Sequence, residues 1–281
     1  MESRRMSKGT NQSPLRGATS RRTILRTGLA VSAVTLVGVW GGRAATNAIR
    51  GTTETAGAAP ATQMPACVVT PQLTEGPYFV DELLFRSDIR SDPATGEVRE
   101  GVPLRLSFRI VQVGSEAACS PLAGAVVDLW QCDALGVYSD VDDPGFSTLG
   151  QKFLRGSQST DDAGAAEFMT IYPGWYRGRT VHIHFKVRTD PDSESGYEFT
   201  SQLFFDDALT DQVFTNEPYA SKGARDTRND NDGIFQGGGD ELLLEIFEEG
   251  DGYAATIDVG IDLSAPAPTN QGGGPPPKDG R

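Results

Sequence analysis

The sequence contains only two histidines, and they lie two residues apart, at His182 and His184. In a β-strand, side chains at positions i and i+2 point to the same face. Val181, Ile183 and Phe185 alternate with them and would face a core. Two imidazoles on one strand face form a chelating pair for a borderline transition metal. The alternative is two polar side chains on a solvated strand face.

Tyrosines offer the further ligands that two histidines cannot supply alone. A cupin-like site would need a third histidine, which the sequence lacks, whereas Tyr138 and Tyr176 lie upstream of the pair. Tyr176 precedes His182 by six residues across a turn, so its side chain can fold back over the same face. A phenol has a reference pKa of about 10, and only a strongly Lewis-acidic centre keeps it ionised near neutrality. Ferric iron meets that need better than Zn²⁺ or Mg²⁺, although a single tyrosine is more often a core or rim residue.

The order of these residues resembles the intradiol ring-cleavage dioxygenases, a family that includes catechol 1,2-, hydroxyquinol 1,2- and protocatechuate 3,4-dioxygenases. The resemblance rests on Tyr138 followed by Pro-Gly-Trp-Tyr-Arg-Gly-Arg-Thr-Val-His-Ile-His-Phe over residues 173–185. Residues 74–79 (Thr-Glu-Gly-Pro-Tyr-Phe) resemble the family's N-terminal segment. Residues 121–125 resemble the family's segment that leads into the strand containing Trp130. The match runs from about residue 70 to residue 247.

The resemblance implies a ferric site and a role for each matching residue. Fe³⁺ would be held, with a hydroxide or water, by Tyr138, Tyr176, His182 and His184. Tyr176 would leave the metal when substrate chelates, and Arg179 would stabilise charge that develops on the substrate. Gln202 matches a pocket glutamine. The pocket mouth would be lined by Gly76, Pro77 and Tyr78, and its wall by Trp175 and Arg177.

The implied reaction uses a catechol-type aromatic and O₂ and needs no flavin or nicotinamide. A catechol that loses both protons can chelate Fe³⁺ through two oxygens, and the metal acts as Lewis acid and template. Cleavage between the two hydroxyl carbons would give a muconate-type dicarboxylate. Two alternatives stay open: a non-catalytic prealbumin-like module, exported to the cell surface as a binding or spacer domain, and a degenerate dioxygenase that binds aromatics without turnover.

Hydrophobic alternation predicts an all-β domain that would place these residues. Apolar residues recur with period two or in short runs, which is typical of strands, at residues 104–110, 125–131, 167–172, 180–188, 199–205, 241–247 and 253–263. Asp161-Asp162-Ala163-Gly164 predicts a tight turn, and residues 208–216 a short helix. With the resemblance, this predicts a two-sheet antiparallel β-sandwich of the prealbumin-like type, with long active-site loops.

The charge of −13 is unevenly distributed. Residues 1–50 hold nine Lys and Arg and one acidic residue, whereas the remaining residues hold 16 basic and 37 acidic side chains. A body this acidic repels phosphate backbones and anionic membranes, so nucleic-acid binding is not expected.

The basic N-terminus resembles a Tat export signal. Arg21-Arg22 form a twin-arginine pattern, and the apolar stretch over residues 27–40 is too short for a stable membrane span but suits a signal sequence. We therefore expect a signal peptide over residues 1–45, with the protein outside the cytoplasmic membrane, at the cell surface or in a periplasm. The alternative is an uncleaved N-terminal anchor.

Composition predicts the remaining boundaries. Residues 46–65 read as a linker, residues 66–263 as the catalytic domain, and residues 264–281, rich in Gly and Pro, as a disordered tail. Residues 46–70 leave no room for the helical dimerisation domain of catechol 1,2-dioxygenases, so the oligomeric state, a homo-oligomer included, is left open.

Two further motifs call for interpretation. Cys67 and Cys119 can form a disulfide in an oxidising compartment, leaving Cys132 free; the alternative is three unpaired thiols. Residues 226–233 resemble a calcium loop, but Arg228 and Gly239 stand where acidic ligands are needed. We interpret that segment as an acidic surface loop.

Overall fold

The computed structural model describes residues 67–114, 118–191 and 196–265. The chain divides into two units, Met1–Gly57 and Ala58–Arg281, and every described residue belongs to the second. The predicted signal peptide, all of the linker and the tail from residue 266 lie outside the described residues. Within the described part, no helix is long and apolar enough to cross a membrane.

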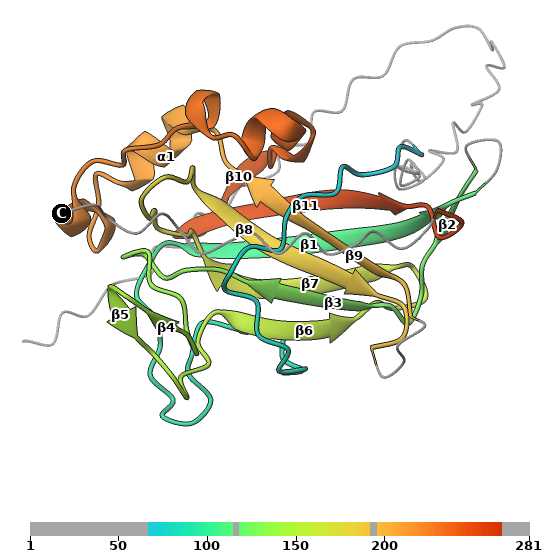
Figure 1. Ribbon diagram of the computed structural model, residues 1–281, viewed down its shortest axis with the longest axis horizontal. Helices are drawn as coiled ribbons and strands as arrows, with labels where there is room; N and C mark the ends of the chain where they lie inside the picture. The colour runs from blue at the N-terminus through green and yellow to red at the C-terminus, as the bar shows by residue number, and fades with distance from the viewer. Residues whose placement is uncertain (1–66, 115–117, 192–195, 266–281) are drawn as a thin grey trace, which may run out of the picture. The chain divides into compact units, whose positions relative to one another are not determined.

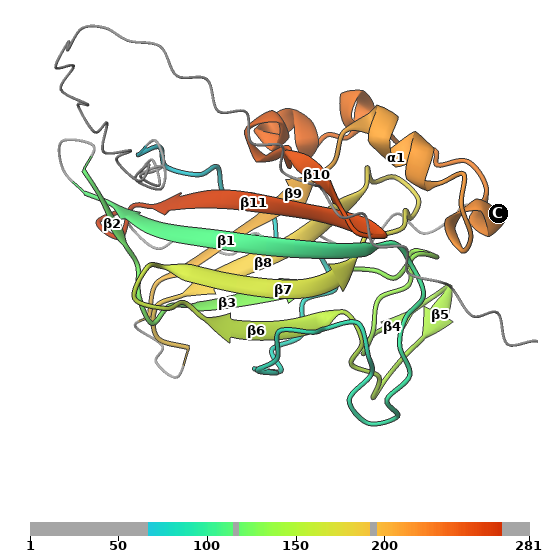
Figure 2. The same cartoon turned by 180° about the vertical axis from the view of Figure 1, so that it is seen from behind.

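Two β-sheets face each other, and a short hairpin lies beside them (Figures 1 and 2). One sheet has the order β10 (Ile246–Glu249), β11 (Gly252–Ile261), β1 (Pro103–Val113), with β2 (Cys119–Pro121) and β7 (Ala165–Ile171) on the far edge of β1. The other has the order β6 (Arg155–Ser159), β3 (Val126–Trp130), β8 (His182–Arg188), β9 (Glu198–Phe204). The hairpin pairs β4 (Asp142–Asp143) with β5 (Phe146–Ser147). The predicted two-sheet sandwich is confirmed.

The core lies between the two sheets and follows the period-two pattern of the sequence. Strand β1 contributes Leu104, Leu106, Phe108 and Ile110, each fully buried. Phe108 packs against Phe185 of β8, with ring centroids 5.3 Å apart. The odd-numbered residues of β8 thus face the core, which leaves His182 and His184 on the opposite face.

One strand pair departs from the antiparallel expectation. β1 and β11 run parallel, from Leu104 opposite Tyr253 to Gln112 opposite Ile261. Parallel neighbours need a long crossover connection, and here the chain crosses to the other sheet and returns before β11 begins.

A helical region connects β9 to β10. It comprises α1 (Asp207–Val213), capped by the Asp206 side chain, and the 3₁₀ turns η2 (Tyr219–Lys222), η3 (Asn229–Asn231), η4 (Phe235–Gly237) and η5 (Gly239–Leu242). The helix predicted near residues 208–216 is confirmed. The strand predicted over residues 241–247 is wrong for residues 241–245, because Leu242 is buried from a 3₁₀ turn and β10 begins only at Ile246.

The N-terminal part of the described chain crosses the outer face of the four-stranded sheet (Figure 1). The backbone N–H of Leu73 donates to the Thr200 carbonyl on β9, and that of Arg86 donates to the Ser157 carbonyl on β6. Lys186 on β8 forms an ion pair of 2.6 Å with Glu75 of this segment. Every residue of β8 is therefore buried, and the histidine face is covered by protein.

A disulfide joins Cys67 to Cys119, with 5.5 Å between the Cα atoms, and Cys132 is a buried free cysteine. The bridge closes a loop of 52 residues. We expect Cys119→Ser to lower the free energy of unfolding by about 3–5 kcal/mol, because the unfolded chain regains loop entropy. Urea unfolding of wild type with and without reductant, and of the variant, measures this. A midpoint in the variant equal to that of oxidised wild type would contradict it.

Candidate metal centre

Three strands of the four-stranded sheet end together at the candidate site. Trp130, the last residue of β3, is opposite His184 on β8, and His184 is opposite Gln202 on β9. The i, i+2 spacing thus places His182 and His184 near the sheet end, where the loops after β3 and before β8 begin.

The two imidazoles converge through their Nε2 atoms. These nitrogens lie 3.0 Å apart, and both side chains are almost fully buried. His182 Nδ1 lies 2.6 Å from the Thr180 carbonyl oxygen, so this nitrogen carries the proton and Nε2 keeps its lone pair. Burial, and then the charge of Arg179 for His182 and the neighbouring imidazole for His184, lower both pKa values well below the ordinary range. Both rings are therefore neutral, as metal ligation requires.

Both predicted tyrosines lie at the same place. The Tyr176 hydroxyl is 3.1 Å from His182 Nε2, and the rings of Tyr138 and Tyr176 meet edge to face at 5.7 Å. Tyr138 is 1% exposed, and its hydroxyl has no hydrogen-bond partner among the described residues. Burial raises the pKa of Tyr176 to about 12 and that of Tyr138 well above its usual value. Burial outweighs the nearby charge of Arg179, so without a bound metal ion both phenols would stay protonated.

Two glycines let the loops that carry these tyrosines touch. A Cβ on Gly136 would lie 2.1 Å from the Trp175 carbonyl oxygen, and one on Gly174 would lie 2.3 Å from the Ala134 carbonyl oxygen. Lys222 also binds the two loops together, donating to the Leu135 carbonyl and, at 2.5 Å, to the Trp175 carbonyl. The position of Tyr138 relative to Tyr176 thus depends on backbone contact between their loops.

Arg179 and Gln202, predicted to share the pocket, are in direct contact. Arg179 Nη2 donates to Gln202 Oε1 at 2.7 Å, and Arg179 Nη1 lies 3.4 Å from His182 Nε2. Gln202 is fully buried and donates through Nε2 to the Thr74 carbonyl at 2.7 Å. Gln202 therefore connects the guanidinium to the segment that crosses the site.

The predicted mouth residues differ in their placement. Gly76 lies against His184, since a Cβ there would be 3.1 Å from His184 Cε1. Tyr78 is buried, stacks on Tyr138 at 4.4 Å and donates its hydroxyl hydrogen to Asp143 at 2.9 Å. Pro77 between them is exposed.

The two residues predicted to form the pocket wall differ in their exposure to solvent. Trp175 is half-buried and donates its indole N–H to the Gly223 carbonyl. The side chain of Arg177 is 76% exposed and points to Asp226. Placing Arg177 in a pocket wall is therefore wrong in this structure, because its guanidinium lies in solvent.

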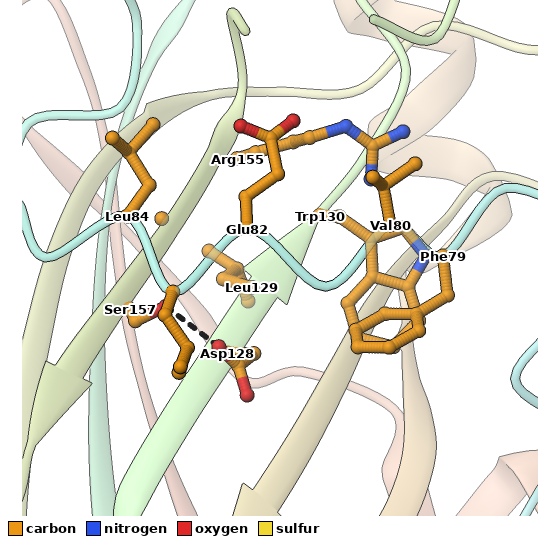
Figure 3. A pocket seen from close by; sticks show the side chains of 11 residues that line it. Phe79, Val80, Glu82, Leu84, Asp128, Leu129, Trp130, Arg155 and Ser157 are labelled. Carbon is orange, nitrogen blue, oxygen red and sulfur yellow. Dashed lines mark hydrogen bonds between the residues drawn. The ribbon is translucent and has the colours of Figure 1, made fainter. Parts of the chain in front are cut away.

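Trp130 also lines a small cavity (Figure 3). Its volume is about 20 Å³, and Phe79, Glu82, Asp128 and Arg155 are among its lining residues. That volume accommodates a single water molecule, not an aromatic ring. Trp130 stacks on His184 with ring centroids 5.0 Å apart and planes 7° apart, and neither histidine lines this cavity.

The donor set fits a ferric ion. His182 Nε2 presents a lone pair toward His184, whose Nε2 atom lies 3.0 Å away, and the buried Tyr138 phenol has no hydrogen-bond partner for its oxygen among the described residues. Two phenolate oxygens with two imidazole nitrogens match a hard, strongly Lewis-acidic metal better than Zn²⁺ or Mg²⁺. Within the described residues no cluster of three His, Cys, Asp or Glu side chains could hold a metal ion, so a metal bound between the two histidines would need the tyrosines as further ligands.

Asp232 is the site residue that the sequence did not reveal. We expected residues 226–233 to be a surface loop, which holds for exposed Asp226 and Asp230. Asp232, however, is 1% exposed and accepts a hydrogen bond from Arg179 Nε at 2.8 Å. The expectation is wrong for Asp232 because its partner lies 53 residues away in the sequence, and no local pattern indicates that contact.

The contact between the two tyrosine loops yields a testable prediction. Gly136 has φ +78°, and any side chain there would collide with the Trp175 carbonyl. We expect Gly136→Ala to separate the loops, reduce bound iron per chain and lower stability by about 1–3 kcal/mol. Gly124→Ala is the matched control, because Gly124 has φ +75° but nothing within 4 Å of its added Cβ. Equal iron content in the two variants would contradict the prediction.

Comparison with known proteins identifies the family. A family model described as "Dioxygenase" matches residues 74–231. The protocatechuate 3,4-dioxygenase beta chain of Burkholderia cepacia is 31% identical over 144 residues, which are 47% of this chain and 59% of that protein. Chlorocatechol 1,2-dioxygenase of Pseudomonas putida is 28% identical over 173 residues, covering 53% of this chain and 54% of that one. The chain thus spans little more than half the length of these curated relatives.

One solved structure is matched over nearly its whole length. The intradiol ring-cleavage dioxygenase from Tetranychus urticae superposes with a TM-score of 0.61 and 30% identity, covering 70% of this chain and 95% of that one. The matched region of the family model contains all four candidate ligands together with Arg179 and Gln202. By fold, by sequence and by this match, the chain belongs to the intradiol ring-cleavage dioxygenase family.

Proposed function

We propose that this protein is a non-haem ferric dioxygenase that cleaves a catechol-type ring between its two hydroxyl carbons. Both atoms of O₂ enter the product, a muconate-type dicarboxylate. The observation that carries the proposal is the convergence of Tyr138, Tyr176, His182 and His184 beside Arg179. A non-catalytic sandwich module has no need for two phenols, two imidazoles and a guanidinium in one buried place.

Tyr138, Tyr176, His182 and His184 would hold the iron. Bound Fe³⁺ supplies Lewis acidity and draws charge from a chelated catecholate, so that the ring becomes reactive toward O₂. Neutral His182 and His184 provide lone pairs without prior deprotonation. Trp130 stacks on His184 and fixes the plane of its ring.

The two tyrosines differ in their freedom to move. Tyr138 is 1% exposed and lies under Tyr78, whereas Tyr176 is only half-buried and belongs to the loop before β8. Tyr176 is therefore the side chain that could leave the iron as a phenolate and accept a catechol proton on its Oη atom, while Tyr138 would remain in place.

Arg179 supplies a fixed positive charge beside the reacting atoms. Its Nε and Nη2 are engaged by Asp232 and Gln202, so Nη1 is the guanidinium nitrogen directed toward His182 Nε2. A preorganised donor in a buried site stabilises negative charge that develops on the substrate without reorganising at that moment.

We also propose that the protein is exported through its twin-arginine N-terminus. The disulfide between Cys67 and Cys119 supports an oxidising destination, and a route for folded proteins would let the iron be bound before export. N-terminal sequencing of exported protein tests this. A start near residue 45 is expected, and an intact N-terminus would contradict cleavage.

Colour and oxygen uptake test the enzymatic proposal. Protein expressed in iron-replete medium is expected to contain about one iron per chain and to show the broad visible band of tyrosinate-to-Fe³⁺ charge transfer. A panel of catechol, hydroxyquinol, protocatechuate and chlorinated catechols, scored by O₂ consumption, would identify the substrate. A colourless, iron-free protein would overturn the proposal and favour the binding module.

A further inference from the structure

Asp232 holds Arg179 in the orientation that the reaction needs. Asp232 Oδ2 accepts a hydrogen bond of 2.8 Å from Arg179 Nε. The side chains of the pair are 1% and 15% exposed. Two groups this buried have little water to screen them, so each is the other's main charge partner.

The carboxylate of Asp232 is itself fixed by backbone donors. Its Oδ2 also accepts the N–H of Thr180 at 2.7 Å, and its Oδ1 accepts the N–H groups of Ile234 and Phe235 at 2.8 and 3.0 Å. Burial alone would raise the pKa of this carboxyl, but Arg179 and these backbone groups lower it overall. The anion is therefore anchored to both the entry of β8 and its own loop.

The contacts of Arg179 leave one guanidinium nitrogen, Nη1, directed toward the histidine pair. Asp232 takes Nε and Gln202 takes Nη2, while Nη1 lies 3.4 Å from His182 Nε2. Two separate anchors define the plane of a rigid guanidinium. Without Asp232, the Arg179 side chain would keep only Gln202 and could rotate or extend toward solvent.

We propose that Asp232 is a positioning residue of the dioxygenase site, acting through Arg179. This inference rests on the proposed function. Asp232 binds neither iron nor substrate, so its loss should reduce turnover without removing the metal or the chelated catechol. Partners that orient a catalytic group typically contribute about 10- to 100-fold.

Asp232→Asn provides the first test. The amide keeps the shape but places an NH₂ group or a neutral oxygen against Arg179 Nε and Thr180 N–H, so one side of the anchor fails. We expect a 10- to 100-fold fall in kcat, with wild-type iron content, visible band and anaerobic catechol affinity. Asp232→Glu keeps the charge and is expected to recover part of the loss. Asp226→Asn is the matched control. Asp226 is an exposed acidic residue of the same loop, and it accepts a hydrogen bond from the Gly178 N–H but none from Arg179.

A double-mutant cycle separates positioning from a general structural role. In an Arg179→Met background, Asp232→Asn is expected to cause no further loss of turnover, because the residue through which it acts is gone. Three results would each overturn the assignment. They are wild-type turnover in Asp232→Asn, loss of iron from that variant, and a fall in turnover on adding Asp232→Asn to Arg179→Met that is as large as in wild type. If wild type itself neither binds iron nor consumes O₂, the proposed function fails instead.

Discussion

Replacing Tyr138 by phenylalanine is expected to weaken the visible band strongly and to remove most of the catechol-dependent O₂ uptake. The Tyr138 hydroxyl is buried and has no hydrogen-bond partner among the described residues. Its removal would take away a proposed metal ligand without breaking a hydrogen bond among the described residues. We expect activity to fall by more than about 100-fold, beyond the loss usual for groups that only support a ligand, while the metal-free protein keeps its melting temperature or gains slightly.

Tyr172→Phe is the matched control for that experiment. Tyr172 is also fully buried, but its hydroxyl lies 2.7 Å from Thr210 Oγ1 and outside the ligand set. This variant is expected to keep colour and activity while losing about 1 kcal/mol of stability, the usual effect of a broken buried hydrogen bond. A Tyr138→Phe protein with a full band, or a Tyr172→Phe protein without one, would contradict the ligand assignment.

Replacing Arg179 by lysine is expected to lower kcat by about 10²- to 10³-fold, the range for losing one preorganised donor to developing charge. Lysine keeps the positive charge but has one nitrogen, which cannot reach Asp232, Gln202 and the site together. Iron content and the visible band should be unchanged, since Arg179 is not a ligand. Single-turnover kinetics with iron-loaded protein, scored by ring absorbance, measures the chemical step.

Arg109→Lys is the control for the arginine experiment. Arg109 pairs with Asp258 across β1 and β11, in the other sheet. It should leave turnover unchanged, since Arg109 contacts none of the candidate site residues. If Arg179→Lys turned over at the wild-type rate, Arg179 would have no role in stabilising charge.

The structure brings the predicted site residues together where they lie close along the chain. His182 and His184 share one strand, and Tyr176 lies in the loop immediately before it, so strand periodicity and one turn place all three. Arg179 lies between them. These positions needed only local geometry, and the structure brings Tyr176, Arg179 and His184 each within hydrogen-bond distance of His182 Nε2.

The sequence did not predict the burial of polar residues whose hydrogen-bond partners are distant along the chain. Asp232 lies in a segment of acidic and polar residues, and nothing local distinguishes it from Asp230, which is exposed. Strand β6 (Arg155–Ser159) was missed for a related reason: its polar sequence lacks alternation, yet Arg155 and Ser157 are buried beneath the segment that crosses the sheet. In both cases tertiary hydrogen bonds, rather than hydrophobic pattern, determine burial.

The most direct test of the central claim is a single turnover under ¹⁸O₂ with the ring-opened product analysed by mass spectrometry. Iron-loaded protein and the best catechol of the panel should give a dicarboxylate cleaved between the two hydroxyl carbons, with one heavy atom in each new carboxyl group apart from exchange with water. Cleavage beside the hydroxyl carbons, a quinone without ring opening, or a product free of ¹⁸O would contradict the claim that these four ligands and Arg179 form an intradiol dioxygenase site.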